Sequence, residues 1–169
     1  LARDLGVFYT FQNKLELMND HIDSLNLDFM NNAIEDCPMI SFLRLEVKGE
    51  IKEYKPYLQS YFDVLQLNKN NFFTDISNYI SYETGQPTHC YDANKLTNSI
   101  TLETIKSDIK FETLLGSTIN LKGNNLVFTQ DDKVINLAGI MGGKNTSCSS
   151  STRSVIIEAA SFNPEHILG

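Results

Sequence analysis

Apolar residues repeat with two different periods along the chain, and each period predicts a different kind of element. Residues 38–51 alternate between apolar and polar side chains, which predicts a strand. Apolar positions at helical spacing over 56–65 predict a helix. A second helix is predicted over 74–83, with Thr74 as its N-cap and Gly85 as its C-terminal stop.

The rest of the chain has the alternation and turn residues of short strands. The predicted strands are residues 89–92, 99–105, 109–114, 118–121, 126–130, 133–138 and 154–160. Turn residues at 122–125 and 131–132 separate some of them. Two helices followed by a run of strands predict an α+β domain. We expect mixed, largely antiparallel sheets with helices packed on one side, in a three-layer, sandwich-like arrangement.

A change of pattern near the start predicts a domain boundary. Residues 1–20 carry apolar side chains at roughly helical spacing, whereas 21–36 are mostly polar. We interpret 21–36 as a linker or an irregular edge, because domain boundaries fall in polar stretches that few contacts cross. Residues 37–169 then form the main domain. The absence of a leading Met and the helical turn just before Gly169 indicate a piece cut from a longer chain.

Composition excludes several classes of protein. Of the 169 residues 41% are hydrophobic, with 10 Phe and 7 Tyr, so the chain can bury a sizeable core. The net charge is −7 and Lys and Arg form no run, which excludes a nucleic-acid binder held by its own basic patch. No apolar run approaches the ~18 residues that a membrane span requires.

Cysteine usage favours a reducing, cytoplasmic location. Cys37, Cys90 and Cys148 lie far apart, their number is odd, and no Cys-x-x-Cys occurs. Neither a disulfide framework nor a zinc knuckle is therefore predicted.

Two segments carry the residues best suited to chemistry, His89 and Glu158. His89 is followed by Cys90, but neighbouring strand side chains point to opposite faces, so we expect no catalytic dyad of the two. Whether His89 is structural or functional stays open on spacing alone. Glu158 lies in an apolar strand on the face of Ile156 and Ala160. Such a carboxylate is either turned to solvent or held in a pocket against a donor.

A glycine-rich segment at 138–144 follows a predicted strand. A phosphate-binding loop would need Gly at Ala138 and Ser or Thr at Asn145, so nucleotide binding is rejected. Two interpretations remain: a tight turn, or a close approach of backbone N–H groups to a ligand.

Taken in order, these segments resemble the central module of the phenylalanyl-tRNA synthetase β subunit of bacterial type. The most specific matches are Gly-Gln-Pro-Thr-His at 85–89 and Gly-Ile-Met-Gly-Gly at 139–143, flanked by 75–79 and 155–162. The resemblance spans roughly Cys37 to Ile167, and residues 1–18 are similar to the tail of the preceding β-subunit domain. This chain has Thr-His-Cys-Tyr-Asp at 88–92, where the family usually has Leu-His-Ala-Phe-Asp.

The resemblance implies an editing module that hydrolyses the ester of tRNA(Phe) mischarged with tyrosine. It implies that His89 and Asn78 are catalytic and position the ester or the attacking water. Glu158 would accept a hydrogen bond from the tyrosine phenol, and no metal is required. The other substrate-binding residues that it implies, whose backbone would steady the developing negative charge, are Gly139, Gly142 and Gly143.

The resemblance also implies partners and limits. The partners are tRNA(Phe), tyrosine as the edited amino acid, and a synthetase α subunit in a heterotetramer of two α and two β subunits. ATP and Mg are expected for the whole enzyme and no cofactor for this fragment. A family segment that completes the pocket would begin beyond Gly169, so we expect the module to be truncated there.

Two rival interpretations stay open. The chain could be a non-catalytic structural or tRNA-docking module of the same synthetase with a decayed pocket. It could also be a free-standing deacylase, although the similarity of residues 1–18 to the preceding β-subunit domain speaks against that.

Overall fold

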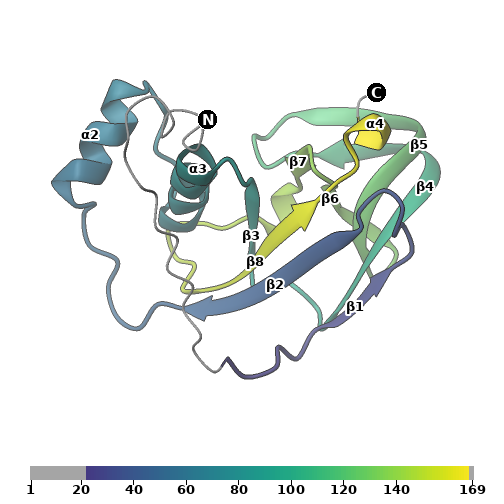
Figure 1. Cartoon of the computed structure of the whole chain (residues 1–169), viewed down its shortest axis with the longest axis horizontal. Coiled ribbons are helices and arrows are strands. Elements are labelled where there is room, and N and C mark those ends of the chain that lie inside the picture. Colours follow the sequence, from purple (N-terminus) through teal and green to yellow (C-terminus); the bar gives the residue numbers. More distant parts are fainter. Residues whose placement is uncertain (1–21, 168–169) are drawn as a thin grey trace, which may run out of the picture.

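A computed structural model describes residues 22–167 of the chain as two β-sheets and a helical layer (Figure 1). The strands are β1 (Asp28–Asn31), β2 (Met39–Glu46), β3 (Thr88–Asp92), β4 (Ser99–Glu112), β5 (Thr118–Gln130), β6 (Lys133–Leu137), β7 (Met141–Gly142) and β8 (Ser154–Ser161). The helices are α2 (Pro56–Val64), α3 (Phe72–Thr84), the 3₁₀ turn η1 (Lys144–Thr146) and α4 (Pro164–Ile167). The predicted α+β class with largely antiparallel sheets is confirmed. The helical pattern predicted within residues 1–20 lies outside the described residues.

The three layers follow from how the strands pair. A three-stranded antiparallel sheet has the order β2-β8-β3, and a five-stranded sheet has the order β1-β4-β5-β6-β7. Only the β1–β4 pair is parallel among the described strands. Figure 1 shows α2 and α3 on one side of the three-stranded sheet and the curled five-stranded sheet on the other.

Two hydrophobic cores lie between these layers. Between the sheets lie fully buried side chains of β3, β4 and β5, including Tyr91, Ile100, Leu102 and Phe128. Between α3 and the three-stranded sheet lie Phe73, Cys90, Cys148 and Val155. Successive side chains of β3 and β8 therefore alternate between the two cores, as a pleated strand requires.

The start of α3 differs from the prediction. The helix begins at Phe72 and its N-cap is Asn71, whose side chain accepts a hydrogen bond from the backbone N–H of Thr74. Asn71 takes the cap because its extended backbone precedes the helix, whereas Thr74 already lies in the first turn. The predicted stop is confirmed: Gly85 caps the C-terminus with a left-handed φ of 75°.

Strand lengths also differ from the prediction. The strand predicted over 38–51 is shorter and ends at Glu46. The four segments expected between 99 and 130 form two long strands, β4 and β5, paired continuously from Thr101 with Thr129 to Glu112 with Thr118. The turn residues at 122–125 do not interrupt β5, because they stay paired with residues 105–108 of β4. The polar stretch 21–36, expected to be a linker or an irregular edge, contributes the edge strand β1.

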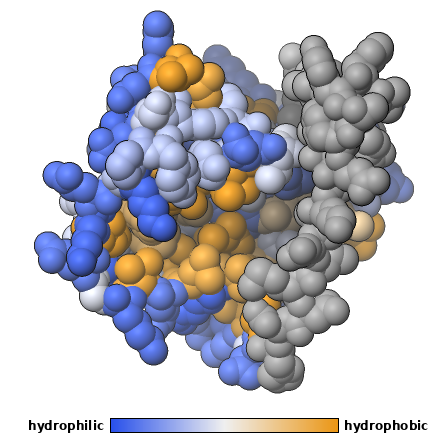
Figure 2. Space-filling view, turned by 60° about the vertical axis from the view of Figure 1, so that its left-hand side comes forward, coloured by the Kyte–Doolittle hydropathy of each residue, from blue (hydrophilic) through white to orange (hydrophobic). Residues whose placement is uncertain are grey.

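The helical layer leaves part of its sheet uncovered. Figure 2 shows hydrophobic side chains gathered at the centre of a face on the helical side of the molecule. An apolar groove there runs between α3 and the three-stranded sheet and is lined by Leu45, Val47, Phe72, Ile76, Ile80 and Ile157 among others. All three cysteines are free and buried.

Candidate functional site

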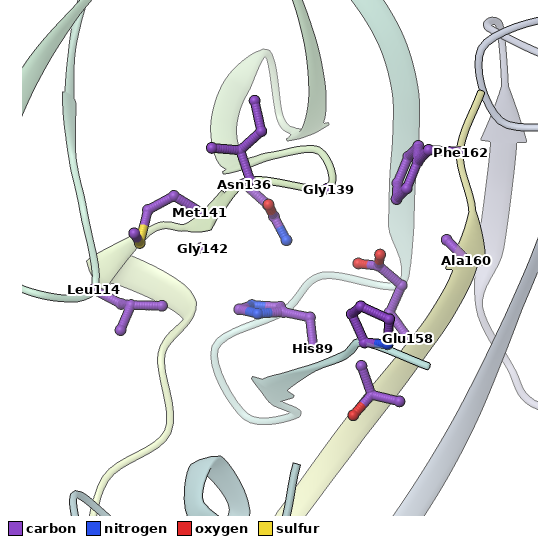
Figure 3. A pocket seen from close by; sticks show the side chains of 12 residues that line it. His89, Leu114, Asn136, Gly139, Met141, Gly142, Glu158, Ala160 and Phe162 are labelled. Atoms are coloured by element: carbon purple, nitrogen blue, oxygen red, sulfur yellow. The ribbon is translucent and has the colours of Figure 1, made fainter. Parts of the chain in front are cut away.

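A pocket of about 240 Å³ opens between the two sheets, where β3 and β8 face the turn between β6 and β7 (Figure 3). Its apolar walls include Leu114, Met141, Ala160 and Phe162. Its polar groups come from His89, Asn136 and Glu158, whose side chains point toward a common space in Figure 3. A cavity of ~150 Å³ holds benzene, so this volume suits an aromatic side chain.

Strand pairing brings His89 and Glu158 together. The two residues lie directly opposite each other in the β3–β8 ladder, and both side chains point to the five-stranded sheet. Cys90 points the other way and its thiol lies 3.7 Å from the backbone oxygen of Phe73. The expectation that His89 and Cys90 form no dyad is confirmed.

A buried chain of hydrogen bonds ends on Glu158. The amide of Asn136 donates to the phenol oxygen of Tyr91 at 2.7 Å, and that phenol donates to Oε2 of Glu158 at 2.7 Å. All three side chains are buried, with Tyr91 fully so. Of the two uses open to Glu158 on sequence alone, the structure therefore shows the carboxylate held against a donor at the pocket.

Burial dominates the ionisation of this carboxylate. Loss of solvent raises the pKa of Glu158 from 4.5 to about 7, and the hydrogen bond from Tyr91 opposes that rise. The carboxylate forms no ion pair with any described residue. Glu158 is therefore a carboxylate that exchanges its proton near neutral pH.

His89 lies at the bottom of the pocket as an uncharged ring. Burial lowers its pKa from 6.5 to about 4. Its ring meets that of Tyr91 edge-on, with the centroids 4.4 Å apart. Its Nε2 is buried and has no hydrogen-bond partner among the described residues. A buried polar atom in that state indicates a missing partner such as water or a ligand.

Gly142 leaves the room that the His89 ring occupies. A Cβ at Gly142 would lie 2.2 Å from Cε1 and 2.8 Å from Nε2 of His89. The backbone of Gly142 does not have positive φ, so a left-handed turn is not the reason for this glycine. Of the two interpretations of the glycine-rich segment, close approach therefore applies at Gly142, but to His89 rather than to a ligand. The tight turn applies at Gly139, where φ is 71°.

Two backbone N–H groups of this segment are already used by the protein. Ile140 donates to the backbone oxygen of Leu137, and Gly143 donates to that of Ile135. These two groups therefore do not serve a developing oxyanion in this conformation.

The structure collects only part of the residue set that the sequence suggested. His89, Gly139, Gly142 and Glu158 line the pocket, whereas Gly143 lines a separate hollow together with residues of β4 and β6. Asn78 is exposed on α3 and is not among the described residues that line the pocket. The roles of all six residues stay predictions. Tyr91 and Asn136 were not predicted as site residues, although the polar Asn136 in the apolar strand β6 was a signal.

Residues 22–167 contain neither a cluster of metal-ligating side chains nor a membrane-spanning helix. No group of three or more His, Cys, Asp or Glu side chains there is placed to hold a metal ion. No helix in that range is long and apolar enough to cross a membrane.

The chain belongs to a known class of domain. Residues 43–169 match the family model described as the B3/4 domain, so the chain belongs to that family. Three curated relatives are phenylalanine–tRNA ligase β subunits. That of Fusobacterium nucleatum is 31% identical over 171 residues, which cover 99% of this chain and 21% of the relative. Those of Psychrobacter arcticus and Bartonella henselae are each 32% identical, over 97% and 85% of this chain and 21% and 18% of the relatives.

A solved structure has the same fold. The N-terminal fragment of the phenylalanyl-tRNA synthetase β subunit from Pyrococcus horikoshii superposes with a TM-score of 0.61, at 13% sequence identity. The match covers 88% of this chain and 47% of that fragment. The resemblance to the phenylalanyl-tRNA synthetase β subunit predicted from the sequence is confirmed. The chain spans about a fifth of the length of the first two relatives named above.

Proposed function

We propose that this chain is the editing module of a phenylalanyl-tRNA synthetase and hydrolyses the ester of tRNA(Phe) mischarged with tyrosine. In this reaction, water adds to the ester carbonyl and the acyl–oxygen bond to the ribose breaks. The products are tyrosine and a free tRNA 3′ end. The observation that carries the proposal is the meeting of a buried carboxylate and an unpartnered imidazole nitrogen in one apolar pocket.

An editing module is needed because the site that activates phenylalanine has limited selectivity against tyrosine. A hydrophobic synthetic site rejects an analogue that merely adds a hydroxyl by only about a hundredfold. A second site that hydrogen-bonds the hydroxyl discriminates better, because a substrate without it leaves a buried acceptor unpaired. Glu158 supplies that acceptor in our proposal, and the apolar walls bury the ring.

His89 positions the reacting groups. At neutral pH its ring is uncharged, so one nitrogen donates a hydrogen bond and the other accepts one. The buried Nε2 lacks a protein partner among the residues described, and the attacking water or the ester takes that place in our proposal. An aminoacyl ester is activated, so orientation of water requires no nucleophilic side chain.

The tRNA is held mostly from outside this chain. The net charge of −7 opposes phosphate binding, which depends on cations and the release of counterions. We therefore assign the phosphate contacts to other parts of the synthetase, including its α subunit.

The test is deacylation of Tyr-tRNA(Phe) by a complete synthetase that carries this chain. His89→Ala should slow hydrolysis by ~100-fold, the order of loss expected when the reacting groups are no longer correctly positioned. Asp75→Asn is the control, because it changes a buried polar side chain that lies on α3, outside the pocket. Phenylalanine activation should be unchanged in both variants.

One observation favours a second candidate, a structural or tRNA-docking module with a decayed pocket. The phenol of Tyr91 already contacts the carboxylate that should read the substrate. The same assay distinguishes the two candidates. A wild-type enzyme that leaves Tyr-tRNA(Phe) intact at every pH between 6 and 8 supports the second candidate.

A further inference from the structure

The hydrogen bonds behind the pocket have one direction. An amide nitrogen can only donate, so the Asn136–Tyr91 contact uses the phenol oxygen as an acceptor. The single phenol proton is then committed to Oε2 of Glu158. Tyr91 has no further proton for a ligand, and it is fully buried.

Tyr91 reaches the carboxylate from behind the pocket wall. Glu158 lines the pocket, whereas Tyr91 is absent from the described residues that do so. In the β3–β8 ladder, Tyr91 is paired with Ile156, two residues from Glu158 along β8, and it belongs to the core between the sheets. The phenol therefore holds one carboxylate oxygen from the interior side.

The second carboxylate oxygen has no such partner. Within residues 22–167, the hydrogen bond to this carboxylate goes to Oε2, and none reaches Oε1. An ionised carboxylate has about four acceptor sites on its two oxygens, so one phenol bond leaves acceptor capacity unused.

We propose that Tyr91, itself held by Asn136, is a positioning residue that fixes Oε2 of Glu158 and leaves Oε1 as the acceptor that selects a hydroxylated aromatic ring. This inference rests on the proposed function. It names Tyr91 as a determinant of specificity that acts through Glu158 from outside the pocket lining, with Asn136 holding its phenol in place.

The surroundings of Glu158 are compatible with this role. The titratable groups near it are His89, Tyr91 and Cys90 on β3, and Cys37 before β2. Burial lowers the pKa of His89 and raises the pKa of each of the other three, so all four are uncharged at neutral pH. No cation among them competes with a substrate hydroxyl for the carboxylate.

The test compares Tyr91→Phe with Tyr54→Phe in the complete synthetase. Both changes remove a phenol that donates to a carboxylate. Tyr54 donates to Asp75 over a distance of 2.6 Å, and this pair lies outside the pocket. The measured quantity is the ratio of kcat/KM for deacylation of tyrosyl-tRNA(Phe) to that of phenylalanyl-tRNA(Phe). Tyr91→Phe should lower this ratio roughly tenfold or more, the loss expected when a hydrogen bond to a charged group is lost. Tyr54→Phe should leave the ratio unchanged.

A pH profile separates positioning from simple structural support. The bond from Tyr91 lowers the pKa of Glu158, so Tyr91→Phe should move the midpoint of the selectivity profile to higher pH. Asn136→Ser keeps the phenol but removes the amide that donates to it, and should lower the ratio by a smaller factor than Tyr91→Phe does. It also keeps the inference testable if Tyr91→Phe does not fold.

Three results would overturn the inference. An equal loss for both esters assigns Tyr91 a structural role only. An unchanged ratio removes Tyr91 from specificity, and a raised ratio means that its phenol blocks Glu158. If wild type hydrolyses neither ester, the proposed function fails. Binding of non-hydrolysable tyrosyl and phenylalanyl adenosine amides to the same variants then decides the inference alone.

Discussion

Gly142→Ala is the smallest change that tests the packing of the pocket. The added Cβ would lie 2.2 Å from Cε1 of His89, 2.8 Å from its Nε2 and 3.0 Å from Cδ2 of Leu114. Side-chain carbons do not approach that closely, so the His89 ring must retreat or the strand β7 must move. Either response displaces the imidazole that faces the pocket.

The expected cost follows from the kind of collision. Overpacking a well-filled site costs ~1–3 kcal/mol in the free energy of unfolding. Two other glycines provide contrast. Gly116→Ala meets no atom within 4 Å but has a φ of 81°, so it should cost ~1–2 kcal/mol through backbone strain alone. Gly143→Ala would place its Cβ 2.5 Å from the backbone oxygen of Ile135, which cannot rotate away, and should cost the most.

The assay is urea unfolding of the three variants, together with NMR of the His89 ring. Only Gly142→Ala should shift the ring resonances of His89 strongly. In a His89→Ala background, Gly142→Ala should become nearly neutral, because the main collision is gone. Wild-type stability and unchanged His89 resonances in Gly142→Ala would refute the packing described for this pocket.

Two further predictions concern stability. In the folded state, the pKa of Glu158 is raised from 4.5 to about 7 and that of His89 is lowered from 6.5 to about 4. The Glu158 contribution, up to ~3 kcal/mol, is present at low pH and lost as pH rises to 7, whereas the similar His89 contribution is lost as pH falls from 6.5 to 4. In urea titrations, the stability of Glu158→Gln relative to wild type should therefore rise as pH rises from 4 to 6.5. The stability of His89→Gln relative to wild type should fall as pH rises from 4.5 to 7. A difference from wild type that does not change with pH in either variant would contradict this. Asn71→Ala should lower the unfolding free energy by ~1 kcal/mol because it removes the cap of α3, and a Thr74→Ala variant as stable as wild type would be consistent with the observed cap.

Local pattern was enough to predict the class of fold and part of the candidate site. Alternation predicts that Glu158 lies on the face of Ile156 and Ala160. It does not predict which face of the strand is buried, because the covering layer is a second sheet. The hydrogen bond between Tyr91 and Glu158 joins residues 67 positions apart in the sequence. It depends on the register of β3 against β8, which no local pattern encodes. In the same way, the need for Gly142 arises from the His89 ring, which comes from another strand.

Strand lengths were missed for a related reason. The residues at 122–125 have turn propensity, and taken alone they predict a break. Continuous pairing of β5 with β4 overrides that propensity, since it satisfies backbone groups on both sides of the predicted break. Propensity is a weak guide wherever a long partner strand is available.

The central claim is that Glu158 reads the hydroxyl of a tyrosyl ester. The most direct measurement is deacylation of tRNA(Phe) carrying tyrosine or phenylalanine by the wild-type synthetase and by Glu158→Gln. Glu158→Gln keeps an acceptor oxygen but removes its charge. A hydrogen bond to a charged group contributes ~1.5–3 kcal/mol against ~0.5–1.5 kcal/mol for a neutral one, so removal of tyrosine should slow roughly tenfold. Slow hydrolysis of the phenylalanyl ester should be unchanged. An equal loss for both esters, or no loss for either, would contradict the account.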